Sequence, residues 1–162
     1  PHAAPSSRAL MQGDLLVIDY GANVKGYVSD ITRTFAIGQI DSKYYEIATV
    51  VLEANRAAHR ITKPGITANA VDEAARSIIE AAGYGEYFIH RTGHGLGLEG
   101  HEPPYIRKDN QLILKPGMTF TIEPGIYIPK ENGIRIEDNI VVTSDGVRTL
   151  TSLPRELLTL PL

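Results

Sequence analysis

The 162-residue chain contains no cysteine, so disulfide bonds and thiolate chemistry are excluded and any bound metal must have oxygen and nitrogen ligands. It has no apolar run of the roughly 18–20 residues that a helix needs to cross a bilayer. Positive charge is not in excess, since the formal net charge is −3, and this gives no electrostatic reason to expect nucleic acid or an anionic membrane as partner. The first residues lack the basic start and apolar centre of a signal peptide. We therefore expect a cytoplasmic protein.

The composition is that of an ordinary globular protein, with 43% hydrophobic and 22% charged residues. A chain of this length buries a real core and corresponds to one domain, which we place over residues 1–162. The chain begins with Pro1 rather than methionine, and we expect it to be part of a longer one.

A β-hairpin is predicted over residues 15–37, where a short apolar run is followed by a glycine-containing turn and a β-branched, aromatic segment. Asp19 ends the first strand and Asp30 interrupts the second. Carboxylates at such positions are costly unless they are paired or bound to metal, which favours a functional role. The alternative, aspartates that only cap turns, fits Asp14 better.

Two amphipathic helices are predicted, over residues 43–60 and 68–82, from the spacing of their apolar side chains. Thr67 is a candidate N-cap of the second helix and Gly83 a candidate stop. His59 lies near the end of the first helix, where the helix dipole accounts for it. We expect both helices to be scaffolding.

Residues 90–104 contain three of the five histidines, His90, His94 and His101, interleaved with glycines. The segment is too rich in glycine for a helix, and we expect the glycines to let substrate approach the backbone. A phosphate-binding loop is a weak alternative, because no Lys-Ser or Lys-Thr pair follows.

Two further strands are predicted over residues 118–128 and 134–143, joined by a turn that brings Glu123 and Glu137 together. They repeat, faintly, the order of strands and carboxylates at residues 15–30. Arg135 lies on the same strand face as Glu137. We expect Asp138, on the opposite face, and Glu99 and Glu102, beside His101, to be solvated or to stand behind the ligands.

Two aspartates, one histidine and two glutamates thus form a set of five candidate metal ligands: Asp19, Asp30, His94, Glu123 and Glu137. Hard oxygen ligands with one imidazole suit Mn²⁺, Co²⁺, Zn²⁺ or Fe²⁺ and are able to bridge two such ions. Two ions close together hold a bridging hydroxide and polarise a carbonyl, which predicts metal-assisted hydrolysis.

These residues lie in motifs that resemble the catalytic domain of the pita-bread metallopeptidases: Xaa-Pro dipeptidases (prolidases), aminopeptidase P and methionine aminopeptidases. The matching segments are Asp19-Tyr-Gly-Ala, Ser-Asp30-Ile-Thr-Arg-Thr, His90-Arg-Thr-Gly-His94-Gly-Leu-Gly, Gly-His101-Glu-Pro-Pro, Thr-Ile-Glu123-Pro-Gly-Ile-Tyr and Gly-Ile-Arg135-Ile-Glu137-Asp. They run in order from Pro1 to about Leu150.

The resemblance implies a role for each ligand. Asp19 would chelate one ion, Asp30 and Glu137 would bridge both, and His94 and Glu123 would hold the second. Glu123 would also exchange a proton with the bridging hydroxide. The ions are expected to be manganese first, with cobalt, zinc or iron as alternatives.

The resemblance also assigns residues that bind substrate. His101 and His2 match histidines that contact the substrate and stabilise the tetrahedral intermediate, although His2 taken alone fits a solvated loop residue. His90 matches a histidine that lines the pocket. Arg135 matches the arginine that stands behind the ligands in the Xaa-Pro branch and is included among the expected substrate-binding residues.

The implied fold is α+β, a curved antiparallel sheet with helices on its outer side. The first-half helices and the N-terminal domain of the family find no counterpart before Pro1, so we expect a C-terminal fragment with an uncovered apolar face. Such a face normally finds a partner. We expect a homodimer, and a chain that depends on the missing N-terminal part and is weakly active alone.

The predicted function is hydrolysis of the Xaa-Pro bond in dipeptides or at peptide N-termini; the sequence does not separate the two. A methionine aminopeptidase is the nearest alternative, disfavoured by Arg135 and the prolidase-like motifs. A non-catalytic binding module or a metal-free hydrolase resembling creatinase is disfavoured because no ligand is lost.

Overall fold

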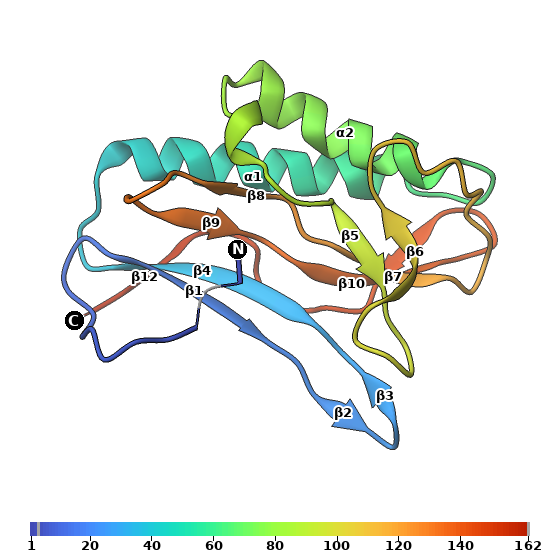
Figure 1. The fold of residues 1–162 in the computed structure, drawn as a ribbon, viewed down its shortest axis with the longest axis horizontal. Coiled ribbons are helices and arrows are strands. Elements are labelled where there is room, and N and C mark those ends of the chain that lie inside the picture. Colours follow the sequence, from blue (N-terminus) through green and yellow to red (C-terminus); the bar gives the residue numbers. More distant parts are fainter. Residues whose placement is uncertain (3, 162) are drawn as a thin grey trace.

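A computed structural model describes residues 1, 2 and 4–161. Two helices pack over curved, mainly antiparallel sheets, so the α+β class is confirmed (Figure 1). Neither helix in this described part of the chain combines the length and apolarity of a membrane-spanning segment.

The predicted hairpin over residues 15–37 is confirmed. It consists of β1 (Leu15–Tyr20) and β4 (Ile31–Ile37), paired in antiparallel register, with the short strands β2 (Asn23–Val24) and β3 (Tyr27–Val28) at its far end. The β2–β3 end projects away from the helices (Figure 1). Asp19 is the last residue but one of β1, and Asp30 immediately precedes β4, so both lie at the same end of the long strand pair.

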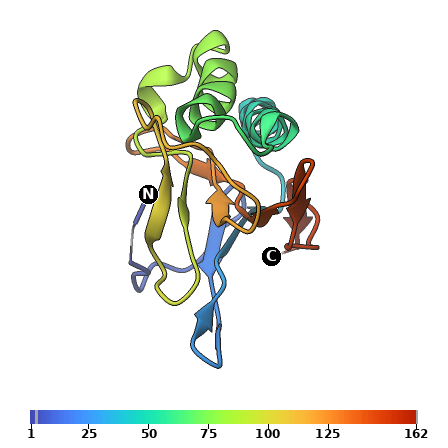
Figure 2. The same cartoon turned by 90° about the vertical axis from the view of Figure 1, so that its right-hand side faces the viewer.

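Both predicted helices form, as α1 (Ser42–Ile61) and α2 (Ala68–Ala81). The Asp41 carboxylate accepts the Lys43 amide and the Thr67 hydroxyl accepts the Ala70 amide, so each helix has a side-chain N-cap. The helices pack against each other on one side of the sheets (Figure 2).

A second sheet has the strand order β11-β10-β7-β5-β6. The bounds are β5 (Gly93–Gly95), β6 (Glu102–Ile106), β7 (Thr119–Ile122), β10 (Asp138–Val142) and β11 (Val147–Thr149). A separate pair, β8 (Gly125–Tyr127) with β9 (Gly133–Arg135), and a 3-10 turn, η1 (Gly85–Tyr87), complete this part.

Each strand predicted beyond residue 117 is divided in two. Pro124, which has no N–H to donate, separates β7 from β8. Ile136 and Glu137 separate β9 from β10, because the Glu137 amide donates to the Thr32 carbonyl of β4 instead of continuing the strand. The division lets Glu123 and Glu137 lie at strand ends, and residues 93–106, for which no strands were expected, supply β5 and β6.

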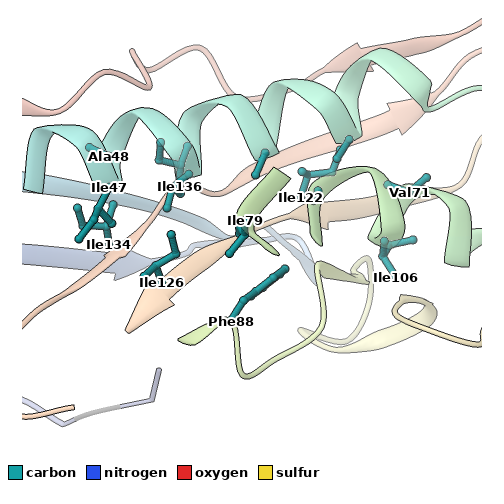
Figure 3. Packing of buried hydrophobic residues seen from close by; sticks show 14 of the residues in the cluster. Ile47, Ala48, Val71, Ile79, Phe88, Ile106, Ile122, Ile126, Ile134 and Ile136 are labelled. Carbon is teal, nitrogen blue, oxygen red and sulfur yellow. The ribbon is translucent and has the colours of Figure 1, made fainter. Parts of the chain in front are cut away.

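The core lies between the helices and the sheets. Ile47 of α1 and Val71 and Ile79 of α2 face Ile122 and Ile126 of β7 and β8, and all five are at most 2% exposed (Figure 3). Burial of this continuous apolar layer is the main favourable contribution to folding.

A further strand, β12 (Leu158–Leu160), pairs in parallel with β4 and makes a three-stranded sheet, β1-β4-β12. Within the described residues no helix lies on the outer face of this sheet (Figure 1). Ile18, Tyr20, Leu158 and Leu160 are 37%, 51%, 46% and 36% exposed there. The expected uncovered apolar face is therefore present.

Candidate metal centre

A pocket of about 420 Å³ opens between the β1–β4 hairpin and the strands that carry His94, Glu123 and Glu137. Its lining residues are Pro1, His2, Asp19, Asp30, His90, Arg91, His94, His101, Glu123, Arg135 and Glu137. All nine residues that the sequence singled out are among them.

The two hairpin aspartates differ in environment. The Asp19 side chain is 43% exposed and pairs with Arg135, whose Nη2 lies 2.5 Å from Asp19 Oδ2. Asp30 is more enclosed, and burial, followed by the charge of Asp19, raises its pKa to about 6. A carboxylate in this situation is stabilised by an added cation.

His94 is buried in β5, at 2% exposure, and is held at both its backbone and its ring. Its amide donates to Thr121 Oγ1, and its Nδ1 donates to the Gly95 carbonyl at 3.1 Å. Nε2 is then the unprotonated nitrogen, and it lies 3.3 Å from Glu123 Oε1 and 3.7 Å from Asp30 Oδ2. Burial lowers the pKa of His94 to about 4, so the ring is neutral and able to bind metal.

The glycines on either side of His94 make room for protein and not for substrate, which corrects the expectation for these two positions. A Cβ at Gly93 would lie 1.8 Å from the Thr121 carbonyl oxygen, and one at Gly95 would lie 2.4 Å from that of Pro103. Only glycine allows β5 to approach its neighbours this closely.

Glu123 and Glu137 each accept a hydrogen bond from a threonine. Thr121 Oγ1 donates to Glu123 Oε1 at 3.1 Å and Thr32 Oγ1 donates to Glu137 Oε2 at 2.6 Å. Burial raises the pKa of both glutamates above the usual range, and the charges of neighbouring pocket carboxylates add to the effect at Glu137.

The charges in the pocket do not balance within the described residues. Four carboxylates face it against two guanidinium groups, those of Arg91 and Arg135, and Arg135 is already engaged with Asp19. Three overlapping groups bring candidate ligand atoms within 4.8 Å of one another: His94–Glu123–Glu137, Asp19–Asp30–Glu137 and Asp30–His94–His101. Divalent cations fit this donor set, because they supply the missing positive charge and accept oxygen and imidazole ligands.

The three remaining histidines differ in burial and contacts. His101 is exposed, and its ring centroid lies 3.9 Å from that of His94, so it is near enough to belong to a ligand group, an arrangement the sequence did not suggest. His2 is exposed at the mouth. His90 Nδ1 donates to the Arg91 carbonyl at 2.7 Å and its Nε2 accepts from Tyr127 Oη at 3.1 Å, so its orientation is fixed.

Arg135 is held by protein groups on several sides. Besides Asp19, its guanidinium donates to Tyr127 Oη at 2.7 Å, to Thr32 Oγ1 at 3.1 Å and to the Pro1 carbonyl at 3.2 Å. It is 4% exposed and also lines the pocket, so it contacts Asp19 within the protein and reaches the pocket wall.

Sequence reasoning missed the hydroxyl groups around the site. Thr32 and Thr121 each lie two positions from a candidate ligand, Asp30 and Glu123, and therefore share its strand face. That spacing is a signal from which both were predictable. Tyr127 carried no comparable signal, because its partners His90 and Arg135 lie on other segments, 37 and 8 residues away.

Two other residues have contacts that the sequence did not indicate. Of the two expectations for Asp138, solvation is wrong, because the residue is 0% exposed and pairs with Arg33 and Arg155 at 2.7 and 2.6 Å. His59 does lie in the last turn of α1, yet it is 9% exposed and its Nε2 is 3.5 Å from Asp138 Oδ2. Both belong to a buried polar cluster that local sequence does not indicate.

A curved antiparallel α+β fold with one buried histidine and four carboxylates in a common pocket is that of the pita-bread proteins. The model of metallopeptidase family M24 matches residues 1–144, and the chain belongs to this family.

Individual relatives agree over the whole chain. The chain is 51% identical to the Xaa-Pro dipeptidase of Pyrococcus furiosus over 98% of its own length and 45% of the relative's. The crystal structure of dipeptidase PepE from Mycobacterium ulcerans matches with a TM-score of 0.98 and 47% identity, over 100% of this chain and 44% of the other. An X-Pro aminopeptidase structure from Thermotoga maritima matches with a TM-score of 0.96 and 42% identity, over 99% and 46%. The chain thus spans less than half the length of these relatives.

Proposed function

We propose that this protein is an exopeptidase that uses two divalent metal ions, with manganese as the first candidate, to hydrolyse the peptide bond before a proline. The observation that carries the proposal is the set of overlapping ligand groups in a pocket whose carboxylates lack enough protein cations. The preference for proline is supported by the relatives named Xaa-Pro dipeptidase and X-Pro aminopeptidase.

Five side chains would hold the ions. Asp19, Asp30 and Glu137 form one group of ligand atoms, and His94 and Glu123 complete the other with Glu137. Bound there, two ions would lower the pKa of a shared water and polarise the peptide carbonyl.

The residues of the chain would move the protons. Burial gives Glu123 a raised pKa, so its carboxyl group is suited to take a proton from the attacking water and pass it to the leaving proline nitrogen. His101 lies at the mouth beside His94, where it would donate to the oxygen of the tetrahedral intermediate. His2 lines the same mouth and would contact the substrate.

His90 and Arg135 would shape the pocket around the substrate. The His90 ring is held by Tyr127 and by the Arg91 carbonyl, and Arg135 shares Tyr127 as a partner. Burial lowers the pKa of His90 to about 4, so it would present a neutral ring to the substrate.

Residues 1–162 would act as one truncated catalytic domain within a larger assembly. The outer face of β1-β4-β12 exposes four large apolar side chains, and the relatives are more than twice as long as the matched segment. We propose that this face is covered in the active protein by the remainder of a full-length chain, that the active protein is a homodimer, and that the 162-residue chain alone is weakly active. Full turnover by the isolated chain as a monomer would contradict this.

The test uses the full-length protein, stripped of metal and reconstituted with Mn²⁺. It should hydrolyse Xaa-Pro substrates and leave matched Xaa-Ala substrates largely intact. Glu137→Gln should abolish turnover, whereas Glu99→Gln, an exposed carboxylate beside the pocket, should retain it. Xaa-Pro dipeptides compared with longer Xaa-Pro-Yaa peptides would decide between dipeptidase and aminopeptidase.

Two alternatives have distinct outcomes in the same assay. Removal of N-terminal methionine, without Xaa-Pro cleavage, would indicate a methionine aminopeptidase. Failure to bind Mn²⁺ or Co²⁺ would indicate a binding module or a metal-free hydrolase on this fold.

A further inference from the structure

Arg33 is a buried arginine in the middle of β4, at 4% exposure, beside Thr32 but on the opposite strand face. Its guanidinium makes five hydrogen bonds of 2.6 to 2.8 Å. The acceptors are the carbonyls of Thr32, Glu137, Leu153 and Pro154 and the carboxylate of Asp138. Apart from Thr32, these partners are more than 100 residues away in the sequence.

The distant acceptors belong to two segments. The first contains Glu137, in the break between β9 and β10, and Asp138, the first residue of β10. The other is the C-terminal segment, which we define as residues 150–160 and which lies along the edge of the molecule (Figure 2). No residue of the C-terminal segment lines the metal-centre pocket.

Asp138 is the second centre of this cluster. Its Oδ1 accepts from Arg33 and its Oδ2 accepts from Arg155 Nε at 2.6 Å. Arg155 Nη2 also lies 3.3 Å from His59 Nε2, which brings this ring into the same cluster. The carboxylate is thereby shared between one arginine of β4 and one of the C-terminal segment.

Two adjacent residues of β4, Thr32 and Arg33, hold Glu137 from both sides. The Glu137 amide donates to the Thr32 carbonyl at 3.1 Å, and the Glu137 carbonyl accepts from Arg33 at 2.6 Å. On the pocket side, the Thr32 hydroxyl donates to the Glu137 carboxylate. Glu123 has no such support from a charged residue among its described hydrogen bonds.

We propose that Arg33, Asp138 and Arg155 are positioning residues through which the C-terminal segment fixes Glu137, so that metal affinity depends on a segment that supplies no ligand. The inference rests on the proposed metal centre. Its physical basis is that a buried guanidinium must keep its acceptors in place, and two of them are the Glu137 carbonyl and the carboxylate next to it in sequence.

The first test changes Arg155, whose side chain is 26% exposed and therefore less critical for folding than Arg33. In the full-length protein, Arg155→Gln should weaken Mn²⁺ binding about tenfold, the lower end of the range for groups that orient metal ligands. Arg155→Lys, which keeps the charge, should recover part of the affinity. Glu156→Gln, at an adjacent side chain that is 60% exposed, should bind as the wild type does.

The dissociation constant is measured by titration calorimetry at a temperature where circular dichroism shows each variant folded. A folded Arg155→Gln protein with wild-type affinity would overturn the inference and leave the metal centre standing. A wild-type protein that binds no Mn²⁺ would overturn both.

A second test needs no variant, because coupling between two sites is reciprocal. Adding Mn²⁺ to the wild-type protein should slow hydrogen exchange in residues 150–160, where the Leu150 amide donates to the Asn139 carbonyl. Residues 62–66, which follow the end of α1, serve as the control and should not change. Unchanged exchange in residues 150–160 on metal binding would contradict the inference even if Arg155→Gln fails to fold.

Discussion

The two main sheets of this protein differ in what covers them. The outer side of the five-stranded sheet and of the β8–β9 pair is covered by α1 and α2, and side chains there such as Ile122 and Ile140 are fully buried. The outer side of β1-β4-β12 is open, with no helix on it among the residues that the structure describes, and exposes Ile18 and Tyr20. The candidate metal centre lies between them, with Asp19 and Asp30 on the open half and the other candidate ligands on the covered half. We therefore expect the covered half to contribute more to the stability of the chain than the open half does.

The largest expected difference between the halves is in core stability. Ile79→Ala removes a fully buried side chain of α2 and should lower the free energy of unfolding by about 2–5 kcal/mol. The matched change Ile18→Ala, at 37% exposure, should cost at most about 1 kcal/mol. Urea denaturation of both variants measures the difference; equal losses would show that the open face is already packed against another part of the protein.

The second prediction concerns pH and metal at the junction of the halves. Because the folded-state pKa of Asp30 is raised to about 6 from 3.8, its stabilising contribution is full below pH 3.8 and lost as pH rises through 6. The raised pKa values of Glu123 and Glu137 extend the loss to higher pH. Without metal, the unfolding temperature should fall between about pH 5 and about pH 8, and saturating Mn²⁺ should reverse the trend.

Differential scanning calorimetry with and without a chelator tests this second prediction. A metal-free protein whose unfolding temperature rises over the same range would show that the carboxylates are not the dominant titrating groups.

A smaller effect is expected where Thr32 of the open half supports Glu137 of the covered half. Thr32→Val keeps the shape and removes the donor, and should weaken Mn²⁺ binding about tenfold, or about 1.4 kcal/mol. Thr49→Val, which removes a hydroxyl that only bonds within α1, is the control. Calorimetric titration showing equal affinities would mean that the Glu137 carboxylate is placed without Thr32.

The smallest effect on stability, and a clear one on association, is expected on the open face. Tyr20→Ser with Leu158→Ser should change the unfolding free energy of the 162-residue chain by less than about 1 kcal/mol. The same pair should reduce any concentration-dependent association of that chain, because it removes exposed apolar area. Sedimentation velocity over a range of concentrations measures this, and unchanged association would place the contact elsewhere.

The fold was predictable where the signal is local. Apolar spacing gave both helices within two residues at each end, and β-branched runs gave the hairpin over residues 15–37. The candidate ligands were predictable as a set because each stands at a strand end or in a glycine-rich segment, and their roles came from resemblance.

What was not predictable depends on contacts between distant segments. The break at Glu137 follows from pairing with Thr32, which is distant in the sequence. The break at Glu123 differs, because it follows from Pro124 and was predictable from proline alone. Nothing in the alternation of polar and apolar residues distinguishes Arg33 or Asp138 from other residues of their strands. Their hydrogen-bond partners lie up to 121 residues away. The periodicity of apolar residues along the chain does not predict such a pairing.

The central proposal is that one pocket would hold two divalent ions on five side chains, with Asp30 and Glu137 shared between them. Equilibrium dialysis of the full-length protein against Mn²⁺, followed by elemental analysis, tests it directly. We predict two ions per chain for the wild type and a loss of affinity for both in Glu137→Gln. A wild type that takes up no Mn²⁺, or a Glu137→Gln variant that still holds two ions as tightly, would contradict the account.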